Sequence, residues 1–431
     1  MSVVTSINSA FSTQSVLPKH YTKMLENGLE IVVVPLHNQS GVIETNVFYK
    51  VGSRNESMGK SGIAHMLEHL SFKSTKNLRA GEFDEIVKGF GGVNNASTSF
   101  DYTRYFIKSS AENMDKSLEL FAELMSNLAL EDSEFQPERN VVAEERLWRT
   151  DNSPMGYLYF RFFNTAYVYH PYHWTPIGFM EDIKAWKIED IRAFYETYYQ
   201  PQNAIVLVSG DIEPNVVFES ATKHFGALKN RTDSIPQVVA KEPKQDGERR
   251  VIVKKDSQVE YLTMGYKIPN YLSKDQVALS AIGEILSSGK SSIFQTELID
   301  RQQIATSAYA YNMDLKDESV FLIVAAARQG VSAESVEKEI YTILDRLKKG
   351  EISQEELEKV KINTRASFIY SLESAGDVAG LFGSYLVRGD ISPLLRYERE
   401  INTLSIEKIK EVANTYFTQD SLSVVILKDT K

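Results

Sequence analysis

The chain contains an internal repeat. Residues of the segment 188–211 return 218 positions later, in the segment 406–429. The matching pairs include Ile188 with Ile406, Glu189 with Glu407, Ile191 with Ile409, Thr197 with Thr415, Tyr198 with Tyr416 and Asp211 with Asp429. In both copies a pattern of helical periodicity leads into a short apolar run of the strand type. Identity and pattern that recur in one register indicate that the chain is built from two related halves.

The two halves also begin alike. Each opens with two runs typical of β-strands, 28–35 and 42–51 in the first half and 249–255 and 259–268 in the second. A helix is predicted after each pair, beginning near Ser61 and near Ser273. We therefore predict an α+β fold of two homologous α/β sandwiches, each a mostly antiparallel sheet with helices on one face. Two such halves can enclose a chamber between them.

A polar segment separates the halves. Residues 229–247 hold Pro236, Pro243 and Gly247 among many charged residues, which is typical of a linker. We predict an N-terminal half of residues 1–228, a linker of residues 229–247 and a C-terminal half of residues 248–431. The length of 431 residues fits this division, because a single hydrophobic core stops growing at about 250–300 residues.

Composition excludes several classes of protein. The 58 acidic and 48 basic residues give a net charge of −10 without a basic block, which disfavours a nucleic-acid or anionic-membrane partner. The absence of cysteine excludes disulfides and thiol nucleophiles. Apolar runs such as 31–36 are far shorter than the ~20 residues of a membrane helix, so we expect no membrane insertion. Residues 1–17 lack the features of a signal peptide, so the chain as written is expected to be cytoplasmic, or periplasmic if a signal peptide has been removed.

One short motif carries the chemistry. His65 and His69 are four residues apart, so on a helix both imidazoles lie on one face and can bind one metal ion. Glu68 lies beside them, where a carboxylate can take a proton from zinc-bound water. The spacing H-x-x-E-H is a metallopeptidase signature. An accidental pattern in a core helix or on a solvated face is the competing interpretation, and it arises in only about one chain in a hundred of this length.

A catalytic zinc ion usually has three protein ligands, so one more is required. The charged helix predicted over residues 134–150 offers Glu138, Glu144 and Glu145. Glu138 and Glu145 share a helix face and Glu144 points elsewhere, but spacing alone does not choose among them. An acidic surface helix is the alternative interpretation. Ligand type also leaves zinc, cobalt and manganese open, because two histidines and a glutamate bind several divalent ions.

The chain resembles the insulinase/pitrilysin-like zinc metallopeptidases, and within them the short branch of bacterial relatives of the mitochondrial processing peptidase. The resemblance covers essentially the whole chain. It rests on the duplicated halves and on five sequence features: His65-x-x-Glu68-His69, the V-x-E-E stretch 142–145, Gly91-Gly92, Asn95-Ala96-x-Thr98 and His170-Pro171-Tyr172. It implies one Zn²⁺ per chain, with Glu145 as the third ligand and Glu138 as a supporting carboxylate on the same helix face.

The resemblance also implies where substrate binds. Asn95 and Ala96 fall on the edge strand that receives an extended peptide as an added β-strand, and Gly91-Gly92 permits a tight turn before it. An ordinary hairpin is the alternative interpretation. His170 and His173 do not form a second metal site in our interpretation, because their spacing flanks a proline and a structural loop explains the segment equally well.

The chain departs from the family pattern at one place. Complete members carry an Arg and a Tyr, seven residues apart, that bind the substrate carbonyl, and the matching positions here hold Ile299 and Thr306. Arg301 and Tyr309 are possible substitutes, although a shift of two or three residues usually turns a side chain away. The loss of the pair resembles the division of labour in two-subunit enzymes. It implies a heterodimer in which a zinc-free homologue supplies both residues, with a homodimer or monomer as the alternative.

The sequence therefore predicts a zinc endopeptidase that cleaves extended peptides or unfolded segments. A non-catalytic scaffold subunit that keeps its metal for stability is the second hypothesis, and the intact Glu68 argues against it. A soluble protein with an accidental motif is the third, and it requires both the repeat and the position of Glu145 to be coincidences.

Overall fold

The computed structural model describes residues 16–430 and contains two β-sheets in that range. The N-terminal sheet has the strand order β1-β2-β6-β3-β5-β4. Its strands are β1 Tyr21–Met24, β2 Glu30–Pro35, β3 Val42–Tyr49, β4 Val93–Thr98, β5 Thr103–Ser110 and β6 Ala204–Gly210. The C-terminal sheet has the order β7-β11-β8-β10-β9. Its strands are β7 Arg249–Lys254, β8 Tyr261–Ile268, β9 Ala305–Asn312, β10 Ser319–Ala327 and β11 Leu422–Lys428.

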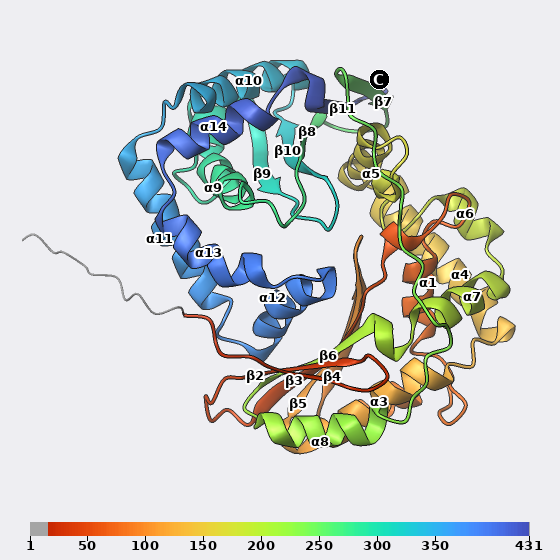
Figure 1. Cartoon of the computed structure of the whole chain (residues 1–431). Coiled ribbons are helices and arrows are strands. Elements are labelled where there is room, and N and C mark those ends of the chain that lie inside the picture. Colours follow the sequence, from red (N-terminus) through yellow and green to blue (C-terminus); the bar gives the residue numbers. More distant parts are fainter. Residues whose placement is uncertain (1–15, 431) are drawn as a thin grey trace, which may run out of the picture.

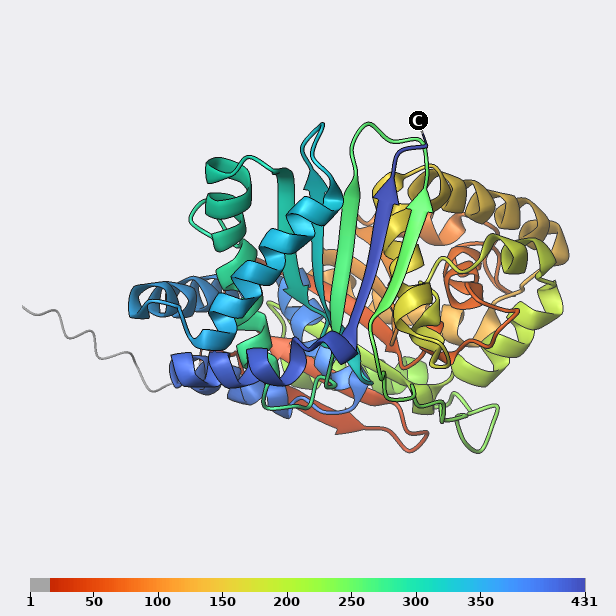
Figure 2. The same ribbon diagram turned by 90° about the horizontal axis from the view of Figure 1, so that it is seen from above.

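The two sheets share one topology. Each contains a single parallel pair, β2 with β6 and β7 with β11, and its other neighbouring strands run antiparallel. In the N-terminal sheet β6 lies between β2 and β3, and in the C-terminal sheet β11 lies in the same way between β7 and β8. Strand β1 is an additional edge strand of the N-terminal sheet. The repeat read from the sequence therefore corresponds to two copies of the same fold, and the prediction of two homologous α+β halves is confirmed. Figure 2 shows the strands of the C-terminal sheet side by side.

Helices follow the same duplicated order. Those of the N-terminal half are α1 Ile63–Leu70, α2 Glu82–Gly89, α3 Met114–Asn127, α4 Asp132–Arg146, α5 Pro154–Ala166, α6 Met180–Ala185, α7 Ile188–Tyr198 and α8 Pro214–Phe225. Those of the C-terminal half are α9 Gln276–Ser287, α10 Ala333–Lys349, α11 Gln354–Tyr370, α12 Ala375–Arg388, α13 Ser392–Asn402 and α14 Ile406–Tyr416. Short helical turns occur at η1 Ser53–Asn55 and η4 Pro171–His173, and π-helical turns at η3 Leu147–Asp151 and η6 Gln295–Arg301. The helix predicted over residues 134–150 is thus α4 followed by η3.

Each sheet is covered on one face by helices of its own half. Alternate residues of the N-terminal strands, such as Val33 and Val47, pack with α1, α3, α7 and α8 in one large apolar cluster. In the C-terminal half, residues such as Met264 and Ile323 pack with α9, α10 and α14. Side chains that alternate along a strand point to opposite faces, so the intervening apolar residues need cover of their own.

That second cover comes from the opposite half. Helix α5, which belongs to the N-terminal half, buries Leu158, Phe162 and Phe163 against the C-terminal sheet. Helix α12, its counterpart in the repeat, buries Phe382 against the N-terminal sheet, where it contacts Phe48 and its neighbours. The exchange ties the halves together, and Figure 1 shows α12 above the N-terminal sheet and α5 beside β7 and β11.

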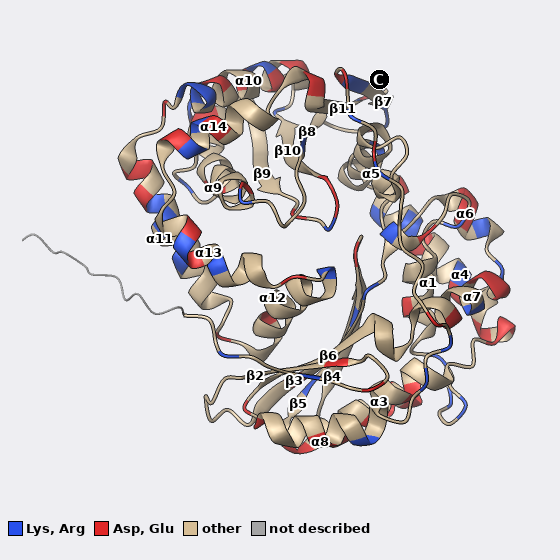
Figure 3. Cartoon of the chain, viewed as in Figure 1, with Lys and Arg blue, Asp and Glu red and all other residues tan. Residues whose placement is uncertain are grey.

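The surface carries charge of both signs. Figure 3 shows acidic and basic residues mixed along the outer helices, including α4, α10 and α11, whereas β8, β9 and β10 are largely uncharged. Residues 229–247 contain no helix or strand. None of the helices within residues 16–430 is both long and apolar enough to cross a membrane.

Candidate metal centre

Helix α1 presents the H-x-x-E-H motif on its less buried side. Its apolar residues face the core of the N-terminal half, with Met66, Leu67 and Leu70 at most 1% exposed. His65, Glu68 and His69 occupy the remaining face and are only partly buried. Because the helix has 3.6 residues per turn, burial of its apolar face against the core leaves the three polar residues of the motif together on the opposite face.

The three predicted ligands lie together. Nε2 of His69 is 3.3 Å from Nε2 of His65 and 3.3 Å from Oε2 of Glu145, and Nε2 of His65 is 3.7 Å from the same oxygen. In a tetrahedral site with bonds of about 2.0–2.1 Å, ligand atoms are about 3.3–3.4 Å apart. The triangle therefore fits one face of a zinc tetrahedron. Within the described residues, these three are the only group of histidine, cysteine or acidic side chains that could hold a metal ion.

Helix α4 supplies the third candidate ligand, Glu145, and the carboxylate of Glu138, which contacts His69. Oε1 of Glu138 lies 2.8 Å from Nδ1 of His69, and its other oxygen lies 2.6 Å from Nζ of Lys73. Nε of Arg149 lies 3.1 Å from Oε1 of Glu145, which leaves Oε2 facing the histidines. A carboxylate on the far nitrogen of a ligating histidine fixes its tautomer and orientation. The structure thus places Glu138 where the family resemblance implied a supporting role.

Glu68 is held by the edge strand. The hydroxyl of Thr98, the last residue of β4, donates to Oε2 of Glu68 at 2.5 Å. Burial raises the pKa of Glu68, and this hydrogen bond opposes the rise by stabilising the charged form. A partly buried carboxylate with a raised pKa beside a candidate metal centre is suited to accept a proton.

The electrostatic surroundings of the two histidines favour a positively charged group. Burial, followed by the charge of His69, lowers the pKa of His65 to about 4. Hydrogen bonds with Glu138 and Glu145 outweigh burial and raise the pKa of His69 to about 9. The same contacts keep the pKa of Glu138 and of Glu145 below the ordinary value. Two carboxylates thus face this histidine pair, which suits a divalent cation better than a neutral group.

Sequence reasoning assigned no role to Thr98, Lys73 or Arg149. Arg149 is four residues beyond Glu145, so helical spacing was a signal for that pair. Lys73 lies beyond the end of α1 and contacts Glu138 of α4, so no local spacing indicated its role. Thr98 belongs to the motif Asn95-Ala96-x-Thr98, but no local pattern indicated its contact with Glu68, which joins a strand to a helix 30 residues away.

The predicted substrate strand is an open sheet edge. β4 pairs with β5 and ends the strand order of its sheet, so its outer side has no strand neighbour among the described residues. Asn95 is exposed and Ala96 is partly buried. An open edge beside a metal centre can pair with an extended peptide by main-chain hydrogen bonds.

The possible substitutes for the missing Arg and Tyr lie far from that strand in the sequence and have other contacts. Arg301 is at the end of η6, its side chain is 65% exposed, and its Nε donates to Glu297 at 2.7 Å. Tyr309 lies on β9, the edge strand of the other sheet, and its ring stacks near Tyr311. Ile299 packs against the C-terminal core.

His170 and His173 occupy a structural loop. Nδ1 of His170 accepts the backbone N–H of Tyr172 at 3.1 Å, and its Nε2 lies 2.9 Å from Asp317. Nδ1 of His173 lies 2.5 Å from the carbonyl of Tyr167. The two side chains thus serve different partners, in line with our interpretation of this segment.

Comparison with known proteins gives the same picture. Residues 32–160 match the model of the family described as Insulinase (Peptidase family M16), and residues 185–364 match that of the Peptidase M16 inactive domain. The chain is 59% identical over 428 residues to the zinc protease PqqE of Helicobacter pylori, with 99% of this chain and 96% of that protein covered. A probable mitochondrial-processing peptidase subunit beta of Arabidopsis thaliana is 24% identical over 423 residues, covering 94% of this chain and 78% of that protein.

Solved structures share the fold. The crystal structure of a protease from Helicobacter pylori matches with a TM-score of 0.94 at 59% identity, covering 96% of this chain and 100% of that one. The periplasmic protease PqqL of Escherichia coli matches with a TM-score of 0.78 at 19% identity. That match covers 95% of this chain but 47% of the longer PqqL chain. The family resemblance drawn from the sequence is thereby confirmed.

Proposed function

Because this chain belongs to peptidase family M16, the insulinase family of zinc proteases, we propose that it is a zinc-dependent endopeptidase whose metal is held by His65, His69 and Glu145. One observation carries the proposal. Three ligand atoms lie 3.3–3.7 Å apart, in the spacing of a zinc tetrahedron, and Glu68 projects from the same helix face beside them. A purely structural site has no need of that carboxylate.

When bound, zinc supplies Lewis acidity that polarises the scissile carbonyl and lowers the pKa of water to about 7. Glu68 then acts as the general base and takes the proton of the attacking water on a carboxylate oxygen. In this proposal the same residue, now protonated, returns the proton to the leaving amine and acts as the general acid. Thr98 fixes the rotamer of Glu68 through its hydrogen bond.

The substrate class follows from the edge of β4. An extended peptide would lie alongside Asn95 and Ala96 as an additional strand, with its scissile bond beside α1. Only a segment without its own secondary structure offers free main-chain groups for such pairing. We therefore propose unfolded or extended peptides, bound between the two halves, as substrates.

We further propose that the active enzyme is a heterodimer. This chain would supply the metal centre, and a zinc-free homologue would supply the Arg and Tyr that stabilise the substrate carbonyl. The proposal is supported by Ile299 and Thr306, which occupy the matching positions, and by Arg301, whose guanidinium is engaged with Glu297. The alternative is a homodimer or monomer in which Arg301 and Tyr309 take the place of that pair.

The test of the catalytic claim is Glu68→Gln. We expect the variant to keep its zinc and to lose cleavage of an unstructured peptide library, because the amide cannot accept the proton. A scaffold subunit would instead show no cleavage in either form. Cleavage by Glu68→Gln at the rate of the unaltered chain would refute the role of Glu68.

The test of the partner claim is reconstitution. The zinc-loaded chain alone is expected to cleave about 10²–10³-fold more slowly than the complex with the homologue, which is the usual cost of a lost oxyanion contact. Addition of the homologue should restore the rate, and a homologue with its Arg substituted should not. Full activity of the chain alone would contradict the heterodimer.

A further inference from the structure

A short segment before α1 contacts both functional elements of the metal centre. In the turn η1, the backbone N–H of Ser53 donates to the carbonyl of Ser99 at 3.1 Å, and that of Arg54 donates to Phe100 at 2.8 Å. Ser99 and Phe100 follow β4 directly, so this segment fixes the end of the strand that carries Thr98. Two residues beyond Arg54 lies Glu56, which contacts α1.

Glu56 caps the helix that carries the predicted ligands. Its Oε2 accepts the backbone N–H of Gly62, and its Oε1 accepts that of Ala64, both at 2.8 Å. Oε2 also accepts Nε1–H of Trp174 at 2.8 Å. Gly62 is the residue before the helix and has no side chain to cap it, so the carboxyl oxygens of Glu56, a residue that is only 6% exposed, supply the missing acceptors. Burial raises the pKa of Glu56 to about 8, and its hydrogen bonds from backbone and indole N–H groups need no charge on the carboxyl group.

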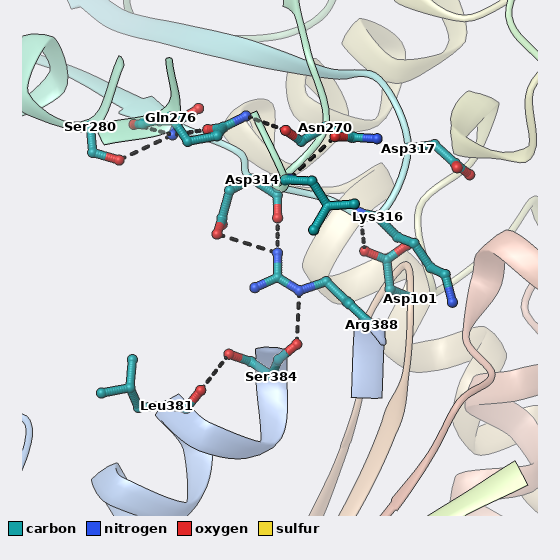
Figure 4. Close-up of polar contacts among 12 residues, drawn as sticks. Asp101, Asn270, Gln276, Ser280, Asp314, Lys316, Asp317, Leu381, Ser384 and Arg388 are labelled. Atoms are coloured by element: carbon teal, nitrogen blue, oxygen red, sulfur yellow. Dashed lines mark hydrogen bonds and ion pairs between the residues drawn. The ribbon is translucent and has the colours of Figure 1, made fainter. Parts of the chain in front are cut away.

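A residue of the C-terminal half clamps this segment. Oδ2 of Asp317 lies 2.5 Å from Nε of Arg54 and 2.9 Å from Nε2 of His170. Asp317 belongs to the loop between β9 and β10, and the same loop donates the N–H of Lys316 to the buried carboxylate of Asp101 at 2.8 Å. Figure 4 shows this loop, with the backbone N–H of Lys316 bonded to Asp101 and Asp314 in contact with Arg388.

The contacts of Asp317 stabilise its charged form. Burial raises the pKa of the Asp317 carboxyl, but hydrogen bonds from His170 and Arg54 outweigh burial and lower it to about 2. The guanidinium of Arg54 is 12% exposed, so loss of the carboxylate would leave a largely buried cation without its partner.

We propose that Asp317, Arg54 and Glu56 are positioning residues, through which the C-terminal half holds α1 and the end of β4 in register. The half that lacks the zinc motif would then act on the metal centre without touching it: Asp317 holds Arg54, the backbone of η1 holds the turn after β4, and Glu56 holds the first turn of α1. The kinetic consequences rest on the proposed peptidase function. The expected change in hydrogen exchange at the start of α1 does not depend on that function.

The same loop provides a matched control. Asp314 forms an ion pair with Arg388 of α12, with Oδ2 3.3 Å from Nη1. Asp314→Asn therefore removes an aspartate–arginine ion pair in the same loop and leaves the hydrogen bond from Arg388 to the Asp314 carbonyl. In the contacts of the described residues, Arg388 touches neither η1 nor α1. A role limited to holding the loop in place predicts similar effects for Asp314→Asn and Asp317→Asn.

The first readout is amide hydrogen exchange in the full chain. Asp317→Asn is expected to speed exchange at the first turn of α1, residues 62–66, at least several-fold, and Asp314→Asn is expected to leave it unchanged. This measurement does not depend on catalysis, so it tests the inference even if the proposed function is wrong. Equal exchange in all three proteins, or equal acceleration in both variants, would overturn the inference.

The second readout is the metal centre. For Asp317→Asn we expect zinc to bind about tenfold more weakly in competition with a chelator, the magnitude usual for residues that orient ligands, and kcat to fall while KM stays within twofold. Asp317→Glu, which restores the carboxylate, is expected to recover most of the affinity. An unchanged zinc affinity in Asp317→Asn would contradict the proposal.

A second variant covers the case in which Asp317→Asn does not fold. Arg54→Gln removes the other partner of the same contact and is expected to give the same loss of zinc affinity. In the double variant the two losses should not add, because both substitutions break one interaction. Additive losses would show that Arg54 and Asp317 act separately and would overturn the proposed coupling.

Discussion

Nδ1 of His69 lies 2.8 Å from Oε1 of Glu138, and the same imidazole turns its Nε2 toward Glu145 at 3.3 Å. One histidine is thus held between two carboxylates of a single helix that are seven residues apart. The first carboxylate orients the ring and the second completes the triangle of candidate ligands.

Loss of the orienting carboxylate should weaken the metal site. For Glu138→Gln we expect zinc affinity to fall about 10–100-fold, because the amide is a poorer acceptor and leaves the ring less well oriented. Competition with a chelator measures the change. Glu144→Gln is the control, since Glu144 lies on the exposed side of α4, and an equal loss in both variants would argue against an orienting role.

The contact between Thr98 and Glu68 should affect the rate rather than the metal. Thr98→Val removes the donor at nearly constant volume, and we expect kcat to fall about tenfold while the zinc content is kept, because a hydrogen bond to a charged group is worth about 1.5–3 kcal/mol. Thr98→Ser keeps the hydroxyl and should retain most of the rate. A Thr98→Val enzyme with unchanged kcat would show that Glu68 needs no such support.

The clamp formed by Asp317 predicts a pH dependence of stability. Its pKa in the folded chain is lowered to about 2 by His170 and Arg54, against the effect of burial. The contact therefore stabilises the fold above the unfolded-state pKa, and that stabilisation is lost as the pH falls from about 4 toward 2. Asp317→Asn should melt at a lower temperature than the unaltered chain at pH 6, with a difference that shrinks below pH 4. A constant difference across this range would contradict the assignment.

The exchange of helices between halves predicts a steric effect. A Cβ atom added at Gly383 of α12 would collide with the ring of Phe48 in the N-terminal sheet. We expect Gly383→Ala to destabilise the chain by about 1–3 kcal/mol, as overpacking does, in thermal or denaturant unfolding. Gly380→Ala, in the same helix, meets only the end of the Arg104 side chain at 3.2 Å and should cost much less. Equal stabilities would mean that α12 does not pack so closely.

The surroundings of Arg301 predict that it is dispensable. Its side chain is 65% exposed and paired with Glu297, so Arg301→Ala should leave the cleavage rate of the active enzyme within about twofold. If Arg301 stabilised the substrate carbonyl, its loss would cost about 10²–10³ in rate. The cleavage rate of the variant therefore decides whether a partner subunit supplies the arginine or this chain supplies it as Arg301.

Features of the structure that depend on local sequence patterns were predicted better than features that depend on contacts between distant residues. The H-x-x-E-H spacing placed His65 and His69 on one helix face, and the repeat predicted two sheets of one topology. Spacing alone left Glu138, Glu144 and Glu145 as alternatives, and only the family resemblance selected Glu145. The choice depends on how α4 packs against α1, and no local pattern records that packing.

Features that depend on the joining of the halves were not predicted. The apolar residues of α5 and α12 indicate burial, but they do not say which sheet buries them. Arg54 and Asp317 are 263 residues apart, and each reads as an ordinary surface charge. Their pairing arises from tertiary structure, so a single sequence carries no signal for it.

The most direct test of the central claim is to measure zinc content and peptide cleavage together, in the unaltered protein and in Glu68→Gln, each purified with any subunit that accompanies it. We predict one zinc per chain in both proteins and a loss of cleavage of about 10²–10⁴-fold in the variant, the usual contribution of a general base. Undiminished cleavage by Glu68→Gln, or an unaltered protein that cleaves peptides without bound metal, would contradict the account.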